Sequence, residues 1–348
     1  MEKPTILIVC HDPGGANVLA PLLKPLAIWA NISIHASPMA LGILQAFSGK
    51  GSTLAANMDE AQAQTILTAH QPSMLLTATS WGTHCETIFR NVAADLGLPS
   101  VVVIDFWSNY GLRFAGAKCP LQELPDTICV MDSDCQQAMV AHGFCAENLR
   151  VTGQPFLDHL FQKAQKKKPQ STPTAKPTGL LLLSQPNLTT HTSILGETLI
   201  PTLARVSQDF FGAEAKPTLH VKPHPKESPT ELQKQLANHG LTPKDVPILD
   251  AQRPLPSLLP RFSHLIGPCT TGLFEARAAG LQVGVLTTGN EAPGLKKAIT
   301  HAGIICLPDQ SPKAILDFLK HKPSAQMGGP QNAIANVLEV IGEILASN

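Results

Sequence analysis

Residues 162–184 read QKAQKKKPQSTPTAKPTGLLLLS and divide the chain into two halves. Residues 162–178 are rich in lysine, proline and threonine and show no apolar periodicity, which is typical of a linker or an exposed loop. The glycine and four leucines that follow, ending at Ser184, predict a buried strand that opens a second domain. We therefore predict an N-terminal domain over residues 1–160, a linker over 161–178, a C-terminal domain over 179–330 and a terminal helix over 331–348 that returns to the N-terminal domain.

Short apolar strands alternate with helices on both sides of this stretch. Upstream, we predict strands near residues 5–10, 32–36, 73–78, 100–105, 127–131 and 149–153, and helices near 16–29, 84–96 and 133–142. Downstream, we predict strands near 179–184, 218–222, 246–249, 263–267, 282–286 and 303–306, and helices near 192–210, 270–280 and 311–320. This alternation predicts parallel sheets covered by helices on both faces. The fold class is therefore α/β, with two Rossmann-like domains facing a cleft that binds ligand at the carboxyl ends of the strands.

The composition argues against several classes of protein and of binding site. The 348 residues carry 26 Lys+Arg against 26 Asp+Glu, and this balance argues against a nucleic-acid binder built on a basic face. The chain has no apolar run of membrane-spanning length, so we predict no transmembrane segment. Peripheral contact with a membrane stays compatible with this composition. Its eight cysteines form no CxxC pair, so we expect reduced thiols in a cytoplasmic protein. The 13 histidines are dispersed, so we expect no metal and no cofactor.

The first predicted strand ends in a loop that could carry chemistry. His11 and Asp12 end the strand, and Gly14 and Gly15 precede a helix. The glycines permit close approach of a substrate, and the helix N-terminus offers N–H groups to an anion. A tight turn with Asp12 as a helix cap is the alternative. We predict Asp12 as the general base, with His11 able to do the same work if Asp12 orients its ring.

Scarce aromatic residues gather in the loops after two later strands. Ser80 and Trp81 follow one strand, and residues 105–110, DFWSNY, follow the next. This concentration predicts a pocket wall for a sugar acceptor; packing against a neighbouring loop is the alternative. Asp105 is a further candidate base, because an aromatic wall would raise its pKa by desolvation, and Glu86 also lies near a strand end. The predicted acceptor-binding residues are Gly14, Gly15, Ser80, Trp81, Trp107, Asn109, Tyr110 and Arg113.

The second half offers groups suited to a nucleotide. Two prolines flank His224 at the end of a strand and fix its backbone, so that His224 and Lys222 can hold a phosphate. Thr270 and Thr271 open a helix, where hydroxyl and N–H groups suit phosphate oxygens, and Glu275 can accept from ribose hydroxyls. A capping box of Thr270 and Glu275 is the alternative. The predicted nucleotide-binding residues are Ser184, Gln185, Lys222, His224, Pro225, Thr270, Thr271 and Glu275.

One acidic motif looks like a metal site of sugar transferases. Asp132-Ser133-Asp134 has the DxD pattern, but it lies where a helix begins. We therefore predict that it caps the helix and holds no metal.

The arrangement resembles the two-domain glycosyltransferase fold called GT-B. Residues 151–158, VTGQPFLD, look like the interdomain segment of nucleotide-sugar 2-epimerases and their transferase relatives. Lys222-Pro223-His224-Pro225 resembles the His-Pro motif of bacterial sialyltransferases, capsule polymer transferases and CDP-glycerol transferases. Thr270-Thr271 stands where those families carry a Ser/Thr motif, and Ser184-Gln185-Pro186 is similar to their first donor-domain loop. The first-loop arginine of the 2-epimerases is replaced here by His11-Asp12, and the double-acid motif of the sialyltransferases is not evident.

The resemblance implies an inverting, metal-independent glycosyltransferase for surface glycan or protein glycosylation. It implies a nucleotide-activated donor, a CMP-linked sugar of the sialic-acid or Kdo kind, and a glycan, lipid-linked or protein acceptor. Two alternatives stay open: a nucleotide-sugar 2-epimerase or hydrolase of the UDP-GlcNAc type, and a non-catalytic nucleotide-sugar binder.

Overall fold

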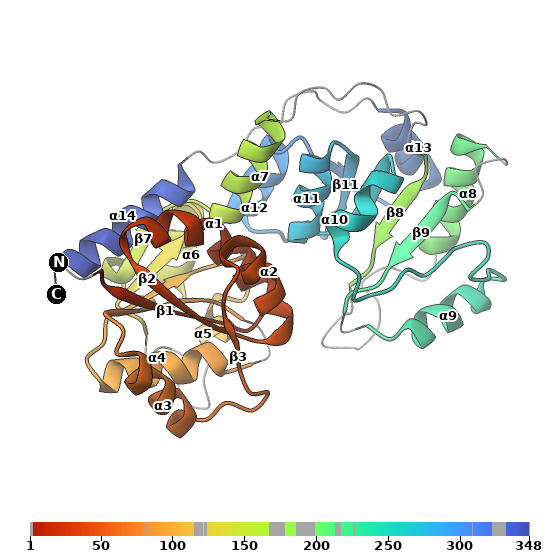
Figure 1. Cartoon of the computed structure of the whole chain (residues 1–348). Helices are drawn as coiled ribbons and strands as arrows, with labels where there is room; N and C mark the ends of the chain where they lie inside the picture. The colour runs from red at the N-terminus through yellow and green to blue at the C-terminus, as the bar shows by residue number, and fades with distance from the viewer. Residues whose placement is uncertain are drawn as a thin grey trace. The chain divides into compact units, whose positions relative to one another are not determined.

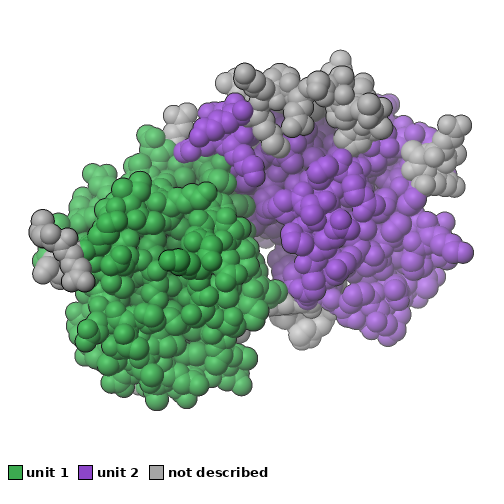
Figure 2. Space-filling view, in the orientation of Figure 1, with its two compact units in different colours: residues 1–159, 292–295, 330–348 green, residues 160–291, 296–329 purple. Residues whose placement is uncertain are grey.

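The computed structural model of the chain (Figure 1) describes most of its residues. The described ranges are 3–80, 83–114, 121, 124–166, 178–185, 199–212, 217–225, 227–307, 309–321 and 332–347. The chain forms two compact units, coloured separately in Figure 2. Unit 1 comprises Met1–His159, Ala292–Leu295 and Pro330–Asn348, and unit 2 comprises Leu160–Glu291 and Lys296–Gly329.

Unit 1 is built on a parallel sheet of seven strands in the order β3-β2-β1-β4-β5-β6-β7. The central strands β1 and β4 are buried along nearly their whole length, which is why they are continuous apolar runs. The strands are β1 (Thr5–Cys10), β2 (Asn31–Ala36), β3 (Ser52–Thr53), β4 (Met74–Ala78), β5 (Ser100–Val103), β6 (Thr127–Val130) and β7 (Leu149–Val151). Since β1 pairs with both β2 and β4, the chain changes direction across the sheet at this point.

Helices connect these strands. They are α1 (Pro13–Trp29), α2 (Pro38–Ser48), α3 (Glu60–His70), α4 (Cys85–Asp95), α5 (Tyr110–Phe114), α6 (Ser133–Ala141) and the short 3₁₀ helix η1 (Ala146–Asn148). Helix α7 (Pro155–Lys166) follows β7, and its residues from Leu160 on belong to unit 2. Residues 161–166, which we predicted as linker, are the last turns of α7, because Gln, Lys and Ala favour a helix. Residues 167–177 of the predicted linker lie outside the described residues.

The C-terminal helix α14 (Ala333–Ala346) belongs to unit 1. The Asp158 carboxylate accepts a hydrogen bond from the Ile334 backbone N–H at 3.1 Å, and the Asn336 amide donates to the Thr152 carbonyl at 3.0 Å. Val337 and Ile341 are fully buried. The last helix of the chain therefore packs on the first unit.

Unit 2 contains a parallel sheet of five strands in the order β12-β11-β10-β8-β9. The strands are β8 (Leu180–Leu183), β9 (Leu219–Lys222), β10 (His264–Pro268), β11 (Gln282–Leu286) and β12 (Ile305–Leu307). The helices are α8 (Leu199–Phe211), α9 (Pro229–Asn238), α10 (Leu255–Leu258), the 3₁₀ helix η3 (Leu259–Arg261), α11 (Thr271–Ala279), α12 (Pro293–His301), whose first residues are part of unit 1, and α13 (Pro312–Lys320). Leu180 and Leu182 of β8 pack in a core that includes Leu203 and Phe318.

One predicted strand of unit 2 is absent from the sheet. Residues 246–249 make a single parallel bridge, Val221↔Ile248, in place of a strand. Pro247 has no N–H to donate, so the pairing with β9 is limited to its carbonyl and to the Leu249 N–H. This prediction was wrong in its extent, although the segment runs where the strand was expected.

Candidate functional site

In unit 1, the carboxyl ends of β1 and β4 are tied together by Glu86, which lies in the first turn of α4. Its Oε1 accepts from the His11 backbone N–H at 2.7 Å and from the Ser80 hydroxyl at 2.5 Å, and Ser80 Oγ accepts from the Asp12 backbone N–H at 3.1 Å. Glu86 is 2% exposed. Burial raises its pKa, while the bonds from Ser80 and His11 and the charge of Arg90 oppose that shift. Glu86 therefore anchors the loops and is too buried to meet a substrate.

His11 and Asp12 form a partly exposed pair on this anchored loop. His11 Nδ1 lies 2.9 Å from Asp12 Oδ1, and their side chains are 31% and 21% exposed. Asp12 occupies the N-cap position of α1 but makes no capping hydrogen bond with its side chain, so the cap alternative does not hold. A carboxylate at Nδ1 orients an imidazole and leaves Nε2 for proton transfer. The arrangement fits the predicted role of this pair.

Asp105 follows β5 and is held by charge, not by an apolar wall. Its Oδ1 accepts from the Thr79 hydroxyl at 2.6 Å and is paired with the Arg113 guanidinium. Arg113 also donates to the Ser108 carbonyl at 2.7 Å and is buried. The aromatic desolvation that we expected for Asp105 is therefore replaced by an ion pair. Arg113, expected to bind an acceptor, is committed to Asp105.

The aromatic side chains near Asp105 are packed inside unit 1. Trp107 is 5% exposed, and its Nε1 donates to Asp132 Oδ2 at 2.6 Å. Tyr110 is 6% exposed. For these two rings the structure corrects the pocket-wall prediction in favour of packing, because little ring surface is left for a sugar. Asn109 is exposed and takes a left-handed backbone (φ 57°) before α5, and Trp81 lies outside the described residues.

The two glycines of the first loop are needed for packing. A Cβ at Gly15 would lie 2.8 Å from the Ala78 Cβ and 3.1 Å from the Cys10 sulfur. A Cβ at Gly14 would lie 2.6 Å from Asp105 Oδ2. The space that we expected beside Asp12 for a substrate is therefore filled by the protein itself at these positions.

Asp132 of the DxD motif caps a helix, as predicted. The Asp132 carboxylate accepts from the Cys135 backbone N–H at 2.7 Å and caps α6. Across the parts of the chain that the structure describes, no group of three or more His, Cys, Asp or Glu residues is placed to hold a metal ion. None of the described helices is long and apolar enough to cross a membrane.

In unit 2, three neighbouring strands end in the predicted nucleotide-binding loops. Ser184 follows β8, His224 follows β9 and Thr270 follows β10, and the sheet places β8 between the other two strands. Thr270 occupies the N-cap position of α11 without a side-chain capping bond, and the side chains of Thr270 and Thr271 are partly exposed. The hydroxyl groups of Thr270 and Thr271 and the first N–H groups of α11 suit the oxygens of a phosphate.

Glu275 and Lys222 are two charged groups near this edge whose pKa values are shifted. Burial raises the pKa of Glu275 to about 7, and the charge of Lys222 partly opposes the shift. Burial lowers the pKa of Lys222, whose Nζ donates to the Ala251 carbonyl at 2.9 Å. Glu275 lies beyond the third residue of α11, so the capping-box alternative is wrong. A carboxyl group poised near neutral pH is typical of functional sites.

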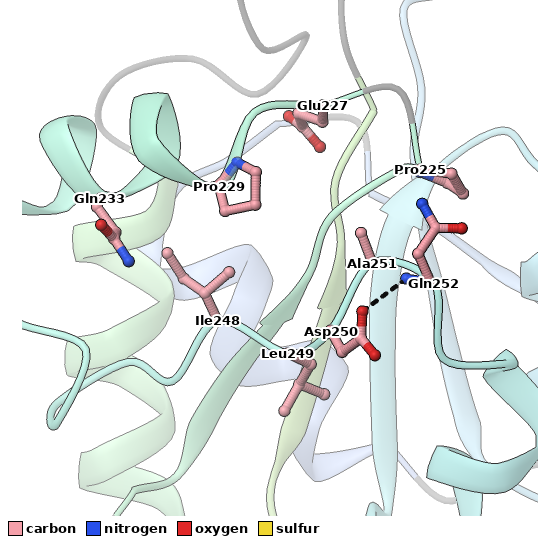
Figure 3. A pocket seen from close by; sticks show the side chains of 9 residues that line it. All are labelled: Pro225, Glu227, Pro229, Gln233, Ile248, Leu249, Asp250, Ala251 and Gln252. Atoms are coloured by element: carbon pink, nitrogen blue, oxygen red, sulfur yellow. Dashed lines mark hydrogen bonds between the residues drawn. The ribbon is translucent and has the colours of Figure 1, made fainter.

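A cavity of about 520 Å³ lies beside the His224 loop, and Figure 3 shows the side chains that line it. Pro225, Pro229 and Ile248 supply apolar wall, and Glu227, Asp250 and Gln252 supply polar groups. The Gln252 backbone N–H donates to Asp250 Oδ1 at 2.9 Å. The cavity lies within unit 2 and is large enough for a ring-sized ligand group. Gln185, also predicted in this region, is partly exposed after β8.

The chain is similar over nearly its whole length to several solved structures. The chain matches a putative UDP-N-acetylglucosamine 2-epimerase from Listeria monocytogenes with a TM-score of 0.67 and 16% identity, over 100% of this chain and 98% of that one. It matches the Methanocaldococcus jannaschii UDP-GlcNAc 2-epimerase in complex with UDP-GlcNAc and UDP with a TM-score of 0.61 and 13% identity, over 97% and 99%. The glycotransferase of kitacinnamycin matches with a TM-score of 0.54 and 13% identity, over 100% and 96%.

The chain has a GT-B-type fold. The prediction of two Rossmann-like α/β domains is confirmed by the two parallel sheets and by these matches. No protein-family model matches the chain, and no curated protein sequence matches it. The specific likeness to sialyltransferases and CDP-glycerol transferases is not supported by the structural matches.

Sequence reasoning did not select two residues that organise these edges. Glu86 was only a candidate base, and Glu227 was not considered. Glu227 closes the turn His224–Glu227, since its N–H donates to the His224 carbonyl at 2.9 Å. An acidic residue three positions after His224 was the available signal, because such a side chain can reach back to the backbone N–H.

Proposed function

We propose that the chain is an enzyme that acts on a uridine-nucleotide sugar, in a 2-epimerase or hydrolase reaction of the UDP-GlcNAc type. The full-length likeness to 2-epimerases, one of them bound to UDP-GlcNAc and UDP, supports this reaction class over the CMP-linked donor expected from the His-Pro motif. The likeness itself concerns the fold, so the argument for a nucleotide rests on the chain's own residues.

The observation that carries the proposal is the set of groups at the carboxyl edge of unit 2. His224, Thr270 and Thr271 supply an imidazole, two hydroxyls and a helix N-terminus, which suit phosphate oxygens. Glu275 supplies a partly buried carboxyl whose ionised form would accept from the two hydroxyls of a ribose. A nucleotide diphosphate combines both chemistries, and Lys222 adds a positive charge to the same edge.

Within unit 1, the His11–Asp12 pair is the group best suited to proton transfer. The His11–Asp12 pair is accessible and oriented, and Glu86 holds its loop. Asp105 is a less suitable base, because Arg113 and Thr79 already occupy Oδ1 and stabilise its charge. In either reaction the leaving nucleotide would be stabilised by the unit 2 groups, with the donors placed before the reaction begins.

Glycosyl transfer is the second candidate, and the His11–Asp12 pair is the observation that favours it. An imidazole oriented by a carboxylate is suited to take a proton from an acceptor hydroxyl. A 2-epimerase or hydrolase needs no acceptor, so the two reactions differ in what they require.

Incubation of the full chain with UDP-GlcNAc alone, followed by proton NMR, tests the proposal. We expect the C2 epimer, or free sugar and UDP, to accumulate without an acceptor. Consumption only in the presence of a glycan or other acceptor would favour transfer. Binding without any turnover over a broad acceptor panel would identify a non-catalytic binder, and absence of UDP binding would reject the proposal.

A further inference from the structure

Glu227 joins the two loops that carry Ser184 and His224. The Ser184 hydroxyl donates to Glu227 Oε1 at 2.6 Å, and the His224 backbone N–H donates to Glu227 Oε2 at 3.1 Å. The carboxylate thus uses one oxygen for each loop. Ser184 follows β8 and Glu227 lies 43 residues later, between β9 and α9. The two bonds therefore bridge neighbouring strand ends.

The two Glu227 bonds connect β8 and β9 beyond the point where the backbone hydrogen bonds between these strands end. β8 and β9 pair in parallel from Leu180↔Leu219 to Leu183↔Lys222, and the Ser184 N–H donates to the Lys222 carbonyl at 3.0 Å. His224 lies two residues beyond Lys222. Charge-assisted hydrogen bonds are stronger than neutral ones, so the carboxylate is a suitable group to extend the connection into the loops.

The backbone of His224 leaves few other ways to orient its side chain. Pro223 and Pro225 flank it and restrict the backbone on both sides. The turn His224–Glu227 is closed by the Glu227 N–H bond to the His224 carbonyl at 2.9 Å and by the carboxylate bond to the His224 N–H. The position of the His224 backbone, from which the imidazole extends, therefore depends on where Glu227 holds this turn.

We propose that Glu227 is a positioning residue that holds His224 in register with Ser184 for binding the phosphate of a nucleotide. This inference rests on the proposed function of the unit 2 edge. Glu227 also lines the adjoining cavity (Figure 3), so its carboxylate lies at the boundary between that cavity and the His224 loop. The Glu227 carboxylate could instead compete with a phosphate for the Ser184 hydroxyl and the His224 N–H. Variants of Glu227 distinguish the two effects.

Three variants separate the loss of the Glu227 hydrogen bonds from the loss of its negative charge. In Glu227→Gln, Oε1 can still accept from the His224 N–H and the amide can donate to Ser184 Oγ, because a serine hydroxyl also accepts. Glu227→Ala loses both bonds. Glu231→Ala is the matched control, since Glu231 is an exposed carboxylate of α9 whose partner is Lys234, 2.8 Å away. The melting temperature of each variant checks that it is folded.

Amide hydrogen exchange of His224, measured by NMR on the ligand-free chain, tests the clamp without a nucleotide. A hydrogen-bonded amide exchanges slowly and loses protection when its acceptor is removed. We expect exchange at least tenfold faster in Glu227→Ala, and within about threefold of wild type in Glu227→Gln and Glu231→Ala. Unchanged exchange in Glu227→Ala would overturn the clamp.

Calorimetric titration with UDP and with uridine tests the role in phosphate binding. We expect UDP affinity to fall about tenfold or more in Glu227→Ala, to be largely retained in Glu227→Gln, and uridine affinity to be similar in all variants. Tighter UDP binding by both Glu227 variants would overturn the proposal in favour of competition. Wild-type chain that does not bind UDP would reject the nucleotide site, and the exchange experiment would still decide whether Glu227 holds His224.

Discussion

Gly14 leaves the space that the carboxylate of Asp105 occupies: a Cβ on Gly14 would lie 2.6 Å from Asp105 Oδ2. Gly14 lies in the first turn of α1, which follows β1, and Asp105 lies in the loop after β5; β4 lies between those two strands in the sheet. A side chain at position 14 would push the carboxylate away from Thr79 and Arg113, its partners. The glycine is thus a consequence of where Asp105 must sit.

Gly14→Ala should therefore destabilise the chain by about 1–3 kcal/mol, the usual cost of overpacking. Gly42→Ala is the matched control: Gly42 lies within α2, nothing lies within 4 Å of its added Cβ, and alanine favours a helix. We expect that control to be neutral or slightly stabilising. Urea denaturation of both variants checks the difference, and equal stability of the two would contradict the account.

Asp12→Asn should lower turnover by about 10²–10⁴-fold, the range for one general base or its orienting partner. UDP affinity should stay close to that of the wild type, because Asp12 belongs to unit 1 and the proposed nucleotide groups belong to unit 2. Asp95→Asn, at the exposed end of α4, controls for the loss of a carboxylate. Turnover of Asp12→Asn within a factor of a few of wild type would move the assignment to Asp105.

Nucleotide binding should depend on pH through Glu275. Its pKa of about 7 leaves the carboxyl partly protonated at neutral pH, and ribose hydroxyls donate best to the ionised form. UDP affinity should therefore fall as the pH is lowered from 8 to 6, and titration calorimetry at several pH values measures this. Glu275→Gln should remove most of the pH dependence; an unchanged profile in that variant would assign it to another group.

The same residue should make stability depend on pH. A carboxyl whose folded pKa is raised stabilises the folded state below its unfolded pKa, and this contribution is lost as the pH rises from about 4.5 towards 7. At roughly 1.4 kcal/mol per pKa unit, and allowing for partial exposure of the side chain, the loss should be about 2 kcal/mol. Urea denaturation of wild type and Glu275→Gln over this range should show the loss in the wild type alone.

The fold could be predicted from the sequence because its central strands are buried on both faces. Such strands are continuous apolar runs, as in β1, β4 and β8, and they stand out from the polar turns that follow. Helix α3 was missed because its sequence is largely polar, although the capping box of Asp59 and Gln62 marked its start. The capping box alone would therefore have been enough to predict this helix.

The partners within each site could not be predicted in the same way. The bond between Ser184 and Glu227 joins residues 43 positions apart, and that between His11 and Glu86 joins residues 75 apart. Such contacts depend on which strands become neighbours, and the apolar pattern does not specify strand order. Arg113 was assigned to an acceptor for another reason: Asp105 lies only eight residues away, but the local turn that pairs the two side chains has no apolar periodicity to reveal it.

Titration of UDP into the wild-type chain and into His224→Ala tests the central claim that unit 2 binds a uridine nucleotide. We predict saturable binding of one UDP per chain, stronger than that of CMP, and a loss of about 1.5–3 kcal/mol in the variant, as expected for a charge-assisted hydrogen bond to phosphate. A folded His224→Ala variant with wild-type affinity, or no nucleotide binding by the wild-type chain, would contradict the claim.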